Sequence, residues 1–263
     1  MSAKREKGER PSSRISGFYR LSPDDRLKKL VELGIISNPS AYDDGLSIEH
    51  ADAMVENVIS TISLPCAVAV NFLIDGVDRL VPMAIEEPSV LAAVSNVAKL
   101  ARNAGGFHTH MDTNEMIGQV QILAVEDPSR VIAVLNQHLP TLLTLSQGVH
   151  PRLIARGGGV RGMEVRHVVY NEPGYPKEDL VVLHFHIDCV DAMGANMINT
   201  IAEHLAPEVE RITGEKVGLR ILSNLADRRV AHAEVTLPVE LLATENVDGA
   251  AVAERIAAAW RFA

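Results

Sequence analysis

Two strand patterns followed by one long helix pattern constrain the fold of this chain most strongly. Residues 163–170 and 179–190, MEVRHVVY and DLVVLHFHIDCV, alternate in polarity and are rich in β-branched residues, which predicts two strands. Residues 196–214 carry apolar side chains at helical spacing, which predicts an amphipathic helix. Since such strands and helices bury their apolar sides against each other, this region predicts a sheet covered by helices.

Similar patterns continue on both sides of this region. Residues 117–125 and 217–222 are predicted strands, and residues 128–146 are a predicted helix that Pro140 must kink or restart. The segment 111–222 is therefore predicted to form a self-contained unit with its strands and helices in split β-α-β order.

The flanking residues 1–110 and 223–263 are predicted to form a second unit, so that the chain as a whole is an α+β protein. Residues 1–16 are basic and polar and are expected to be a mobile tail. The elements expected in this unit are helices that follow caps at Ser22 and Ser47, a hairpin at Asp75-Gly76, and a helix that begins at Pro88.

Charge and cysteine content narrow the partners. The formal net charge of -9 repels nucleic acid and anionic membranes, and no window reaches the roughly 18 apolar residues of a membrane span. No apolar segment follows the basic start, so a signal peptide is not expected. Cys66 and Cys189 belong to no C-x-x-C pair, which fits reduced thiols and a cytoplasmic location.

Glu86 and Glu87 lie between an apolar run and a proline in VPMAIEEPSV, residues 81–90. Acidic residues at the start of a helix complement its dipole, and on spacing alone this is the simpler interpretation. A functional interpretation requires that the apolar flanks bury one carboxyl, which would raise its pKa and let it act as an acid near neutral pH. Spacing leaves both interpretations open.

Two polar segments at predicted strand ends are candidate ligand sites. DAMGAN, residues 191–196, combines small residues with the start of a helix, whose N–H groups can bind a pyrophosphate. It lacks the G-x-G-x-x-G fingerprint, and a tight turn without a ligand fits equally well. ILSNLADRR, residues 221–229, is polar enough to contact a substrate but is also typical of a solvated loop.

The histidines raise a metal alternative. His108-x-His110 and His184-x-His186 each place two imidazoles on one face of an extended segment, as in some zinc sites. Neither pair has a third ligand at a recognisable spacing. We therefore expect no metal site, and a metal hydrolase stays as a third hypothesis.

Five motifs in order resemble class II hydroxymethylglutaryl-CoA reductase. They are ENVI (56–59), VPMAIEEPSVLAA (81–93), GGF (105–107), DAMGANMINT (191–200) and RILSNLADRR (220–229), and the resemblance extends from about residue 20 to residue 263. The family reduces hydroxymethylglutaryl-CoA to mevalonate and CoA with two hydrides from NADH or NADPH, or catalyses the reverse reaction. The resemblance implies a large helical α+β domain for the CoA ester, an inserted small ferredoxin-like domain for the cofactor, and a homodimer.

The resemblance also implies roles for individual residues. Glu87 matches the catalytic acid, since an oxygen that gains charge during thioester reduction needs a proton source beside it. Ser89 and Asn224 match residues that contact the substrate, and Arg20 matches an arginine near the CoA phosphates. The matches in the dinucleotide-binding turn are Asp191, Ala192, Met193, Gly194, Ala195 and Asn196.

The same comparison suggests a cofactor preference. Members that prefer NAD carry an acid seven residues before a G-G-G, where this chain has His150 with Arg152 close by. A basic pair suits the 2′-phosphate of NADPH better than the 2′-hydroxyl of NADH.

One family segment has no counterpart in the sequence. D-P-Y-R-A-A-T-H-N-K-G, which holds the catalytic lysine and a substrate-binding arginine, should begin just after Ala263. The family's aspartate, histidine and flap would lie further on. We therefore expect a truncated form with little reductase activity, because losing residues that act as a unit costs several orders of magnitude in rate. The alternative is a catalytically inert cofactor-binding or assembly module.

Overall fold

The computed structural model describes residues 11–42, 45–123 and 125–263. The chain folds into two compact units. The inserted unit comprises His110–His232, and the flanking unit ends at Thr109 and resumes at Ala233. The sequence placed these boundaries at 110/111 and 222/223.

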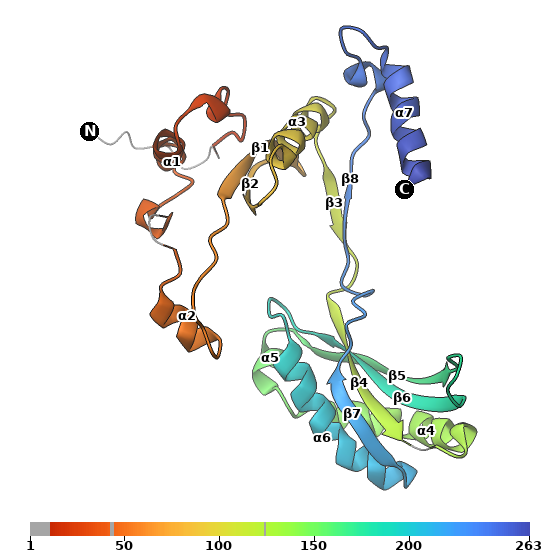
Figure 1. Ribbon diagram of the computed structural model, residues 1–263. Coiled ribbons are helices and arrows are strands. Elements are labelled where there is room, and N and C mark those ends of the chain that lie inside the picture. The colour runs from red at the N-terminus through yellow and green to blue at the C-terminus, as the bar shows by residue number, and fades with distance from the viewer. Residues whose placement is uncertain (1–10, 43–44, 124) are drawn as a thin grey trace. The chain divides into compact units, whose positions relative to one another are not determined.

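The inserted unit is a four-stranded sheet with helices packed on it (Figure 1). The strand order is β5-β6-β4-β7, and every neighbouring pair is antiparallel. Along the chain the two long helices alternate with the strands in the order β-α-β-β-α-β, with the short α5 before the second strand. The elements are β4 (Glu115–Leu123), α4 (Pro128–Gln147), α5 (Pro151–Ala155), β5 (Gly159–Tyr170), β6 (Glu178–Asp188), α6 (Ala195–Thr213) and β7 (Lys216–Leu222).

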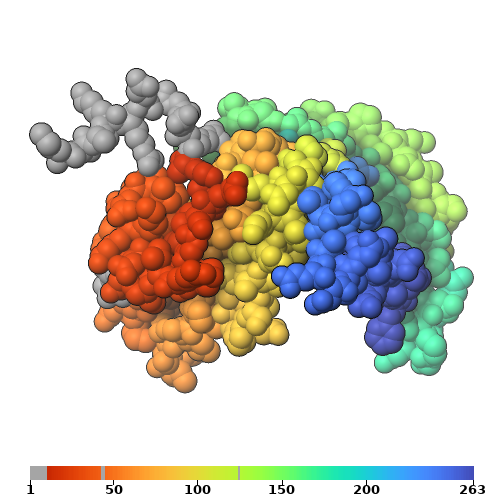
Figure 2. Space-filling model, turned by 90° about the horizontal axis from the view of Figure 1, so that it is seen from above, coloured from red at the N-terminus to blue at the C-terminus, as the bar shows by residue number. Residues whose placement is uncertain are grey.

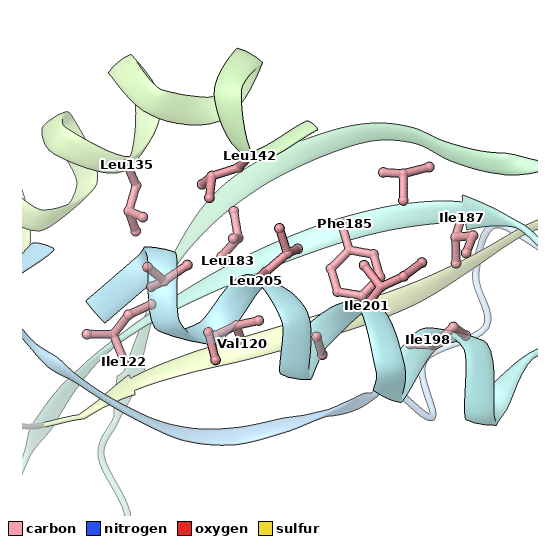
Figure 3. Packing of buried hydrophobic residues seen from close by; sticks show 14 of the residues in the cluster. Val120, Ile122, Leu135, Leu142, Leu183, Phe185, Ile187, Ile198, Ile201 and Leu205 are labelled. Atoms are coloured by element: carbon pink, nitrogen blue, oxygen red, sulfur yellow. The ribbon is translucent and has the colours of Figure 1, made fainter. Parts of the chain in front are cut away.

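The core of this unit lies between the sheet and helices α4 and α6 (Figure 3). Alternate residues of β6 point into it, and the register places Leu183 opposite Val120 of β4. Phe185 lies opposite Gly118, where an added Cβ would meet the phenyl ring at 2.1 Å, so the glycine makes room for the ring. The helices contribute fully buried leucines and isoleucines, including Leu135, Leu142, Ile198, Ile201 and Leu205.

Helix α4 continues through Pro140, so of the two predicted effects, a kink or a restart, the restart does not occur. Pro140 is exposed, whereas Leu135 and Leu142 on either side of it are fully buried. Proline removes one backbone hydrogen bond from a helix interior, and burial of these apolar neighbours keeps the helix in one piece.

The flanking unit contains an antiparallel hairpin of β1 and β2 with α3 packed against β1. Ser22 and Ser47 cap α1 and α2 through their hydroxyl groups, and Asp75-Gly76 forms the hairpin turn, as the sequence predicted. Its elements are η1 (Phe18–Arg20), α1 (Pro23–Glu32), η2 (Pro39–Tyr42), α2 (Ile48–Met54), β1 (Cys66–Ile74), β2 (Val77–Ala84), α3 (Val90–Asn103), η3 (Val239–Leu242) and α7 (Gly249–Phe262).

Two details of this unit differ from the prediction. The first ten residues of the expected mobile tail lie outside the described residues, but Ser13 within it is buried. Its hydroxyl donates to the carbonyl of Phe72 at 2.7 Å, and its backbone N–H donates to Asp78, which also pairs with Arg102. Helix α3 begins at Val90 rather than at Pro88, two residues later than predicted.

The boundary between the units falls inside a two-stranded ribbon of β3 (His108–Met111) and β8 (Ala231–Glu234). None of the helices in the described parts of the chain combines the length and the hydropathy that crossing a bilayer requires.

Candidate functional site

The turn after β6 contains a strained backbone position. Val190 has a φ of 55° and Gly194 a φ of 99°, so both lie in the left-handed region. A β-branched residue in this region is an outlier that costs on the order of 1–3 kcal/mol. Such strain persists only where the surroundings impose it, and here it accompanies the reversal of the chain between Asp188 and the start of α6 at Ala195.

Gly194 brings this turn into contact with the end of β6. A Cβ at this position would lie 2.4 Å from Cys189 Sγ, so a larger residue requires a rearrangement. Gly194 is also the N-cap of α6 and provides no side-chain cap to the first turn of the helix. Backbone N–H groups at an uncapped helix start can donate to an anion. An uncapped helix start of this kind is compatible with a bound phosphate group.

Arg229 connects the polar segment after β7 to this turn. Its guanidinium donates hydrogen bonds to the carbonyl oxygens of Ala192 and Met193, each at 3.3 Å. The side chain of Met193 itself is 70% exposed. The structure therefore brings together the segments 191–196 and 221–229, which the sequence suggested as separate sites.

Asp188 fixes the other side of the turn, and no sequence motif had indicated it. Its Oδ1 accepts the backbone N–H of Val190 at 2.9 Å, and its Oδ2 accepts a bond from Arg161 at 3.0 Å. The Val190 N–H and the Arg161 guanidinium outweigh partial burial and lower the pKa of this carboxyl below its ordinary value. Asp188 is therefore an ionised acceptor that holds Val190 in place.

His150 lies next to the first turn of α6. Its Nε2 donates to the carbonyl oxygen of Met197 at 3.1 Å. Since His150 directly precedes α5, this bond joins the start of α5 to the first turn of α6. Arg152, in the last turn of α5, is exposed. Of the predicted cofactor residues, His150 and the 191–196 turn are thus in one place.

Asn224 is exposed in a loop whose backbone is held on both sides of it. The N–H of Ser223 donates to the carbonyl of Ile117 at 2.8 Å, and the N–H of Leu225 donates to the Ser223 hydroxyl at 3.1 Å. The amide of Asn224 is therefore presented to solvent from a fixed backbone.

A groove of about 1190 Å³ lies in the flanking unit and is lined by many apolar residues, by the cationic residues Arg14, Arg26 and Lys99, and by the acidic Asp24. The segment around α1 that forms one side of it lies at the surface seen in Figure 2 (red). Arg20 is adjacent to the lining residue Tyr19, whose hydroxyl accepts a bond from Arg20 Nε at 3.0 Å. The guanidinium also lies 5.3 Å from the centre of that ring. The lining of the groove therefore has more cationic than acidic residues, and Arg20 is exposed next to it.

Glu87 and Ser89 lie between β2 and α3 and do not line this groove. Both side chains are exposed, and so is Glu86, so the burial of one carboxyl that the functional interpretation requires is not found. Ser89 is the N-cap of α3 and has a φ of 74°, and its hydroxyl makes no capping bond. The backbone rather than burial is the unusual feature of this segment, because a non-glycine residue rarely adopts this conformation.

His184 and His186 are buried on the sheet face opposite the helical core. The Glu164 carboxylate lies 3.9 Å from His184 Nδ1 and 3.4 Å from His186 Nε2. The Nδ1 atoms of both histidines are buried without a hydrogen-bond partner among the described residues. Burial lowers the pKa of each imidazole, with the nearby guanidinium charge of Arg166 or Arg228 as the next cause. Burial therefore favours the neutral form of both rings. The alternation of residues along the strand had left open whether this face of the sheet is buried or exposed to solvent.

Comparisons with known proteins agree with the five motifs. The sequence model of the family "Hydroxymethylglutaryl-coenzyme A reductase" matches residues 22–263. The 3-hydroxy-3-methylglutaryl-coenzyme A reductase of Archaeoglobus fulgidus is 43% identical over 255 residues, which cover 95% of this chain and 57% of that protein. A probable reductase of the same name from Borreliella burgdorferi is 31% identical over 92% of this chain and 55% of its own length.

A solved structure is similar over most of the chain. The class II 3-hydroxy-3-methylglutaryl-CoA reductase from Streptococcus pneumoniae, bound to NADPH in open conformations, superposes with a TM-score of 0.86 at 34% identity. The match covers 94% of this chain and 67% of that one. The chain spans little more than half the length of the curated relatives that it matches.

Proposed function

The chain belongs to the hydroxymethylglutaryl-coenzyme A reductase family, and we propose that it acts in the NAD(P)H-dependent interconversion of hydroxymethylglutaryl-CoA with mevalonate and CoA. The observation that carries this proposal is the turn from Val190 to Asn196. It combines a left-handed Val190, a Gly194 in contact with Cys189, and an uncapped α6 next to His150. These are features of a site for a dinucleotide phosphate group.

We infer that the dinucleotide bound at this turn is NADPH. The absence of a side chain at Gly194 lets the turn pack against Cys189 with a positive φ, and Arg229 holds the neighbouring carbonyl groups of Ala192 and Met193, so the start of α6 is held in a fixed position for a pyrophosphate. His150 and Arg152 would lie near the 2′-phosphate, and NADH remains the second cofactor that the family uses. When bound, the cofactor supplies the hydride, and the residues of the chain bind it and orient it.

For the substrate we propose four contacts. Glu87 supplies a proton to the oxygen that gains charge during reduction, and its exposed carboxyl becomes an effective acid once substrate excludes water from it. Ser89 and Asn224 donate hydrogen bonds to the substrate from fixed backbones. Arg20 binds a CoA phosphate beside the basic groove of the flanking unit, because guanidinium groups suit phosphate oxygens.

In this proposal the inserted unit is the small ferredoxin-like cofactor domain and the flanking unit is the CoA-ester domain. The β-α-β-β-α-β order supports the first assignment and the basic groove supports the second. A homodimer follows from the family, and the almost fully exposed Ile59 (97%) and Ile62 (92%) support a buried partner surface there. The free thiols of Cys66 and Cys189 support a reducing, cytoplasmic location.

These 263 residues do not contain the segment D-P-Y-R-A-A-T-H-N-K-G with the family's catalytic lysine. We therefore propose that a polypeptide of these residues alone binds ligands but turns over slowly. Groups that act as a unit lose most of their effect when one is missing.

Calorimetric titration of the purified protein with hydroxymethylglutaryl-CoA tests this function. We expect saturable binding that Arg20→Ala weakens by about tenfold, the loss of one charge-assisted phosphate contact of about 1.4 kcal/mol. Lys28→Ala is the matched control, because Lys28 is an exposed cation in α1 that pairs only with Asp25 among the described residues and does not line the groove. Absence of binding to the unaltered protein would refute the proposal.

A further inference from the structure

Two histidines from distant parts of the sequence face each other on the β3–β8 ribbon. The rings of His110 and His232 stack with their centres 4.4 Å apart and their planes inclined by 4°. The N–H of Asp112 donates to the carbonyl of Val230 at 3.1 Å, which sets the register that places His110 opposite His232. Asp112 follows His110 by two residues and so projects from the same side of the strand.

Asp112 completes a group of three metal-binding side chains. Its Oδ2 lies 3.0 Å from His232 Nε2. One ligand atom of each of the three residues lies within 4.8 Å of the other two. His110 and Asp112 are exposed and His232 is half-buried, so an ion can reach them from solvent.

We propose that His110, Asp112 and His232 bind one divalent transition-metal ion of the class that favours imidazole, with Zn²⁺ as the probe. A tetrahedral zinc ion holds its ligands at about 2.0–2.1 Å, so ligand atoms come to about 3.4 Å from one another. Because imidazole lone pairs lie in the ring planes, both rings must rotate out of the parallel stack before their nitrogens point at one ion, and the same rotations close the group to that spacing. Water takes the fourth position, since the site opens to solvent.

The chemistry of the three groups favours a cation over a purely structural contact. Two imidazoles stacked at 4.4 Å repel each other when both are protonated, and neutral imidazoles are good ligands for zinc, copper and nickel. The Asp112 carboxylate adds the negative charge that such an ion attracts.

The site has a structural consequence for the ribbon. The chain passes from one unit to the other twice, after Thr109 in β3 and after His232 in β8. An ion held by His110 on one strand and His232 on the other joins these strands. Because it binds only when they are paired, it stabilises the ribbon by mass action. This inference is independent of the proposed reductase function.

Zinc titration of the purified, tag-free protein by calorimetry tests the site. We expect one Zn²⁺ per chain, and we expect His232→Asn and Asp112→Asn each to weaken binding by at least about tenfold, since even losing an outer-shell partner costs about 10- to 100-fold. The matched control is His108→Asn, which removes a histidine of the same strand outside the group and leaves the affinity unchanged.

A second measurement needs no variant. In nuclear magnetic resonance spectra of the unaltered protein, the imidazole signals of His110 and His232 should shift together during the zinc titration, and those of His108 should not. The proposal is wrong if zinc does not bind, or if binding survives both substitutions in the group. It is also wrong if the His108 signals respond instead.

Discussion

His150 Nε2 lies 3.1 Å from the carbonyl oxygen of Met197, so the residue before α5 is joined to the first turn of α6. This contact places an imidazole beside the proposed dinucleotide turn. It also means that a substitution at His150 can act in two ways, through charge near the cofactor or through loss of a hydrogen bond to α6. The first prediction separates the two.

His150→Asp should shift the cofactor preference from NADPH towards NADH by about tenfold or more, because a carboxylate repels the 2′-phosphate and accepts a bond from a 2′-hydroxyl. His150→Gln is the control, since its amide nitrogen has the reach of His150 Nε2 and can still donate to Met197. The ratio of the two dissociation constants, from cofactor fluorescence titrations, is the measurement. An unchanged ratio in His150→Asp would contradict a role for His150 in cofactor choice.

Arg229→Ala should weaken NADPH binding by roughly 3- to 10-fold, because two hydrogen bonds that fix the turn at Ala192 and Met193 are lost. The neighbouring Arg228 contacts Glu115 at 3.6 Å, so Arg228→Ala removes a similar charge without touching the turn. Equal losses in the two variants would indicate a general charge effect and would contradict the positioning role of Arg229.

Replacing Ser89 by glycine and by valine should have different effects on the free energy of unfolding. Ser89→Gly removes the strain of a φ of 74° and should be at least as stable as the unaltered protein, whereas Ser89→Val should lose about 1 kcal/mol or more in urea unfolding. Both variants lack the hydroxyl and should bind hydroxymethylglutaryl-CoA more weakly. Normal substrate binding by Ser89→Gly would exclude the proposed contact.

The free energy of unfolding should fall as the pH drops below about 6.5, the ordinary pKa of histidine. Burial lowers the pKa of His184 and His186, so in this range the unfolded state binds more protons than the folded state does. Above about pH 6.5 both states are neutral at these rings and the effect vanishes.

Urea unfolding at pH 7.5 and pH 5.5 measures this loss. Replacing His184 and His186 together by glutamine should reduce the difference between the two pH values. His204→Gln, at an exposed position of α6, should leave the difference as it is. If the difference in unfolding free energy between the two pH values is the same in all three proteins, groups other than His184 and His186 cause it.

Local signals in the sequence predicted much of the fold. The caps at Ser22 and Ser47, the Asp75-Gly76 turn and the helix from Pro128 each depend on neighbouring residues, and all are found. Pro140 was expected to kink or restart the helix, and the restart does not occur because burial of the apolar side chains on either side of it outweighs one lost backbone bond.

The sites depended more on contacts between distant residues. DAMGAN was recognisable because small residues between a strand and a helix indicate close backbone approach. Arg229 is part of the RILSNLADRR motif, but the motif does not show that this residue bonds to the turn, and Asp188 belongs to no motif. Likewise, the partner of His110 lies on β8, and only the pairing of β3 with β8 reveals it.

The most direct test of the central claim is an NADPH titration of three proteins, the unaltered chain, Gly194→Ala and Gly214→Ala. Both glycines have positive φ and bound the same helix α6, but only a Cβ at Gly194 would collide, at 2.4 Å from Cys189 Sγ, whereas nothing lies within 4 Å at Gly214. We predict saturable binding to the unaltered chain and to Gly214→Ala, and at least about tenfold weaker binding to Gly194→Ala. Absence of NADPH binding to the unaltered chain, or equal affinity in all three proteins, would contradict a dinucleotide site at this turn.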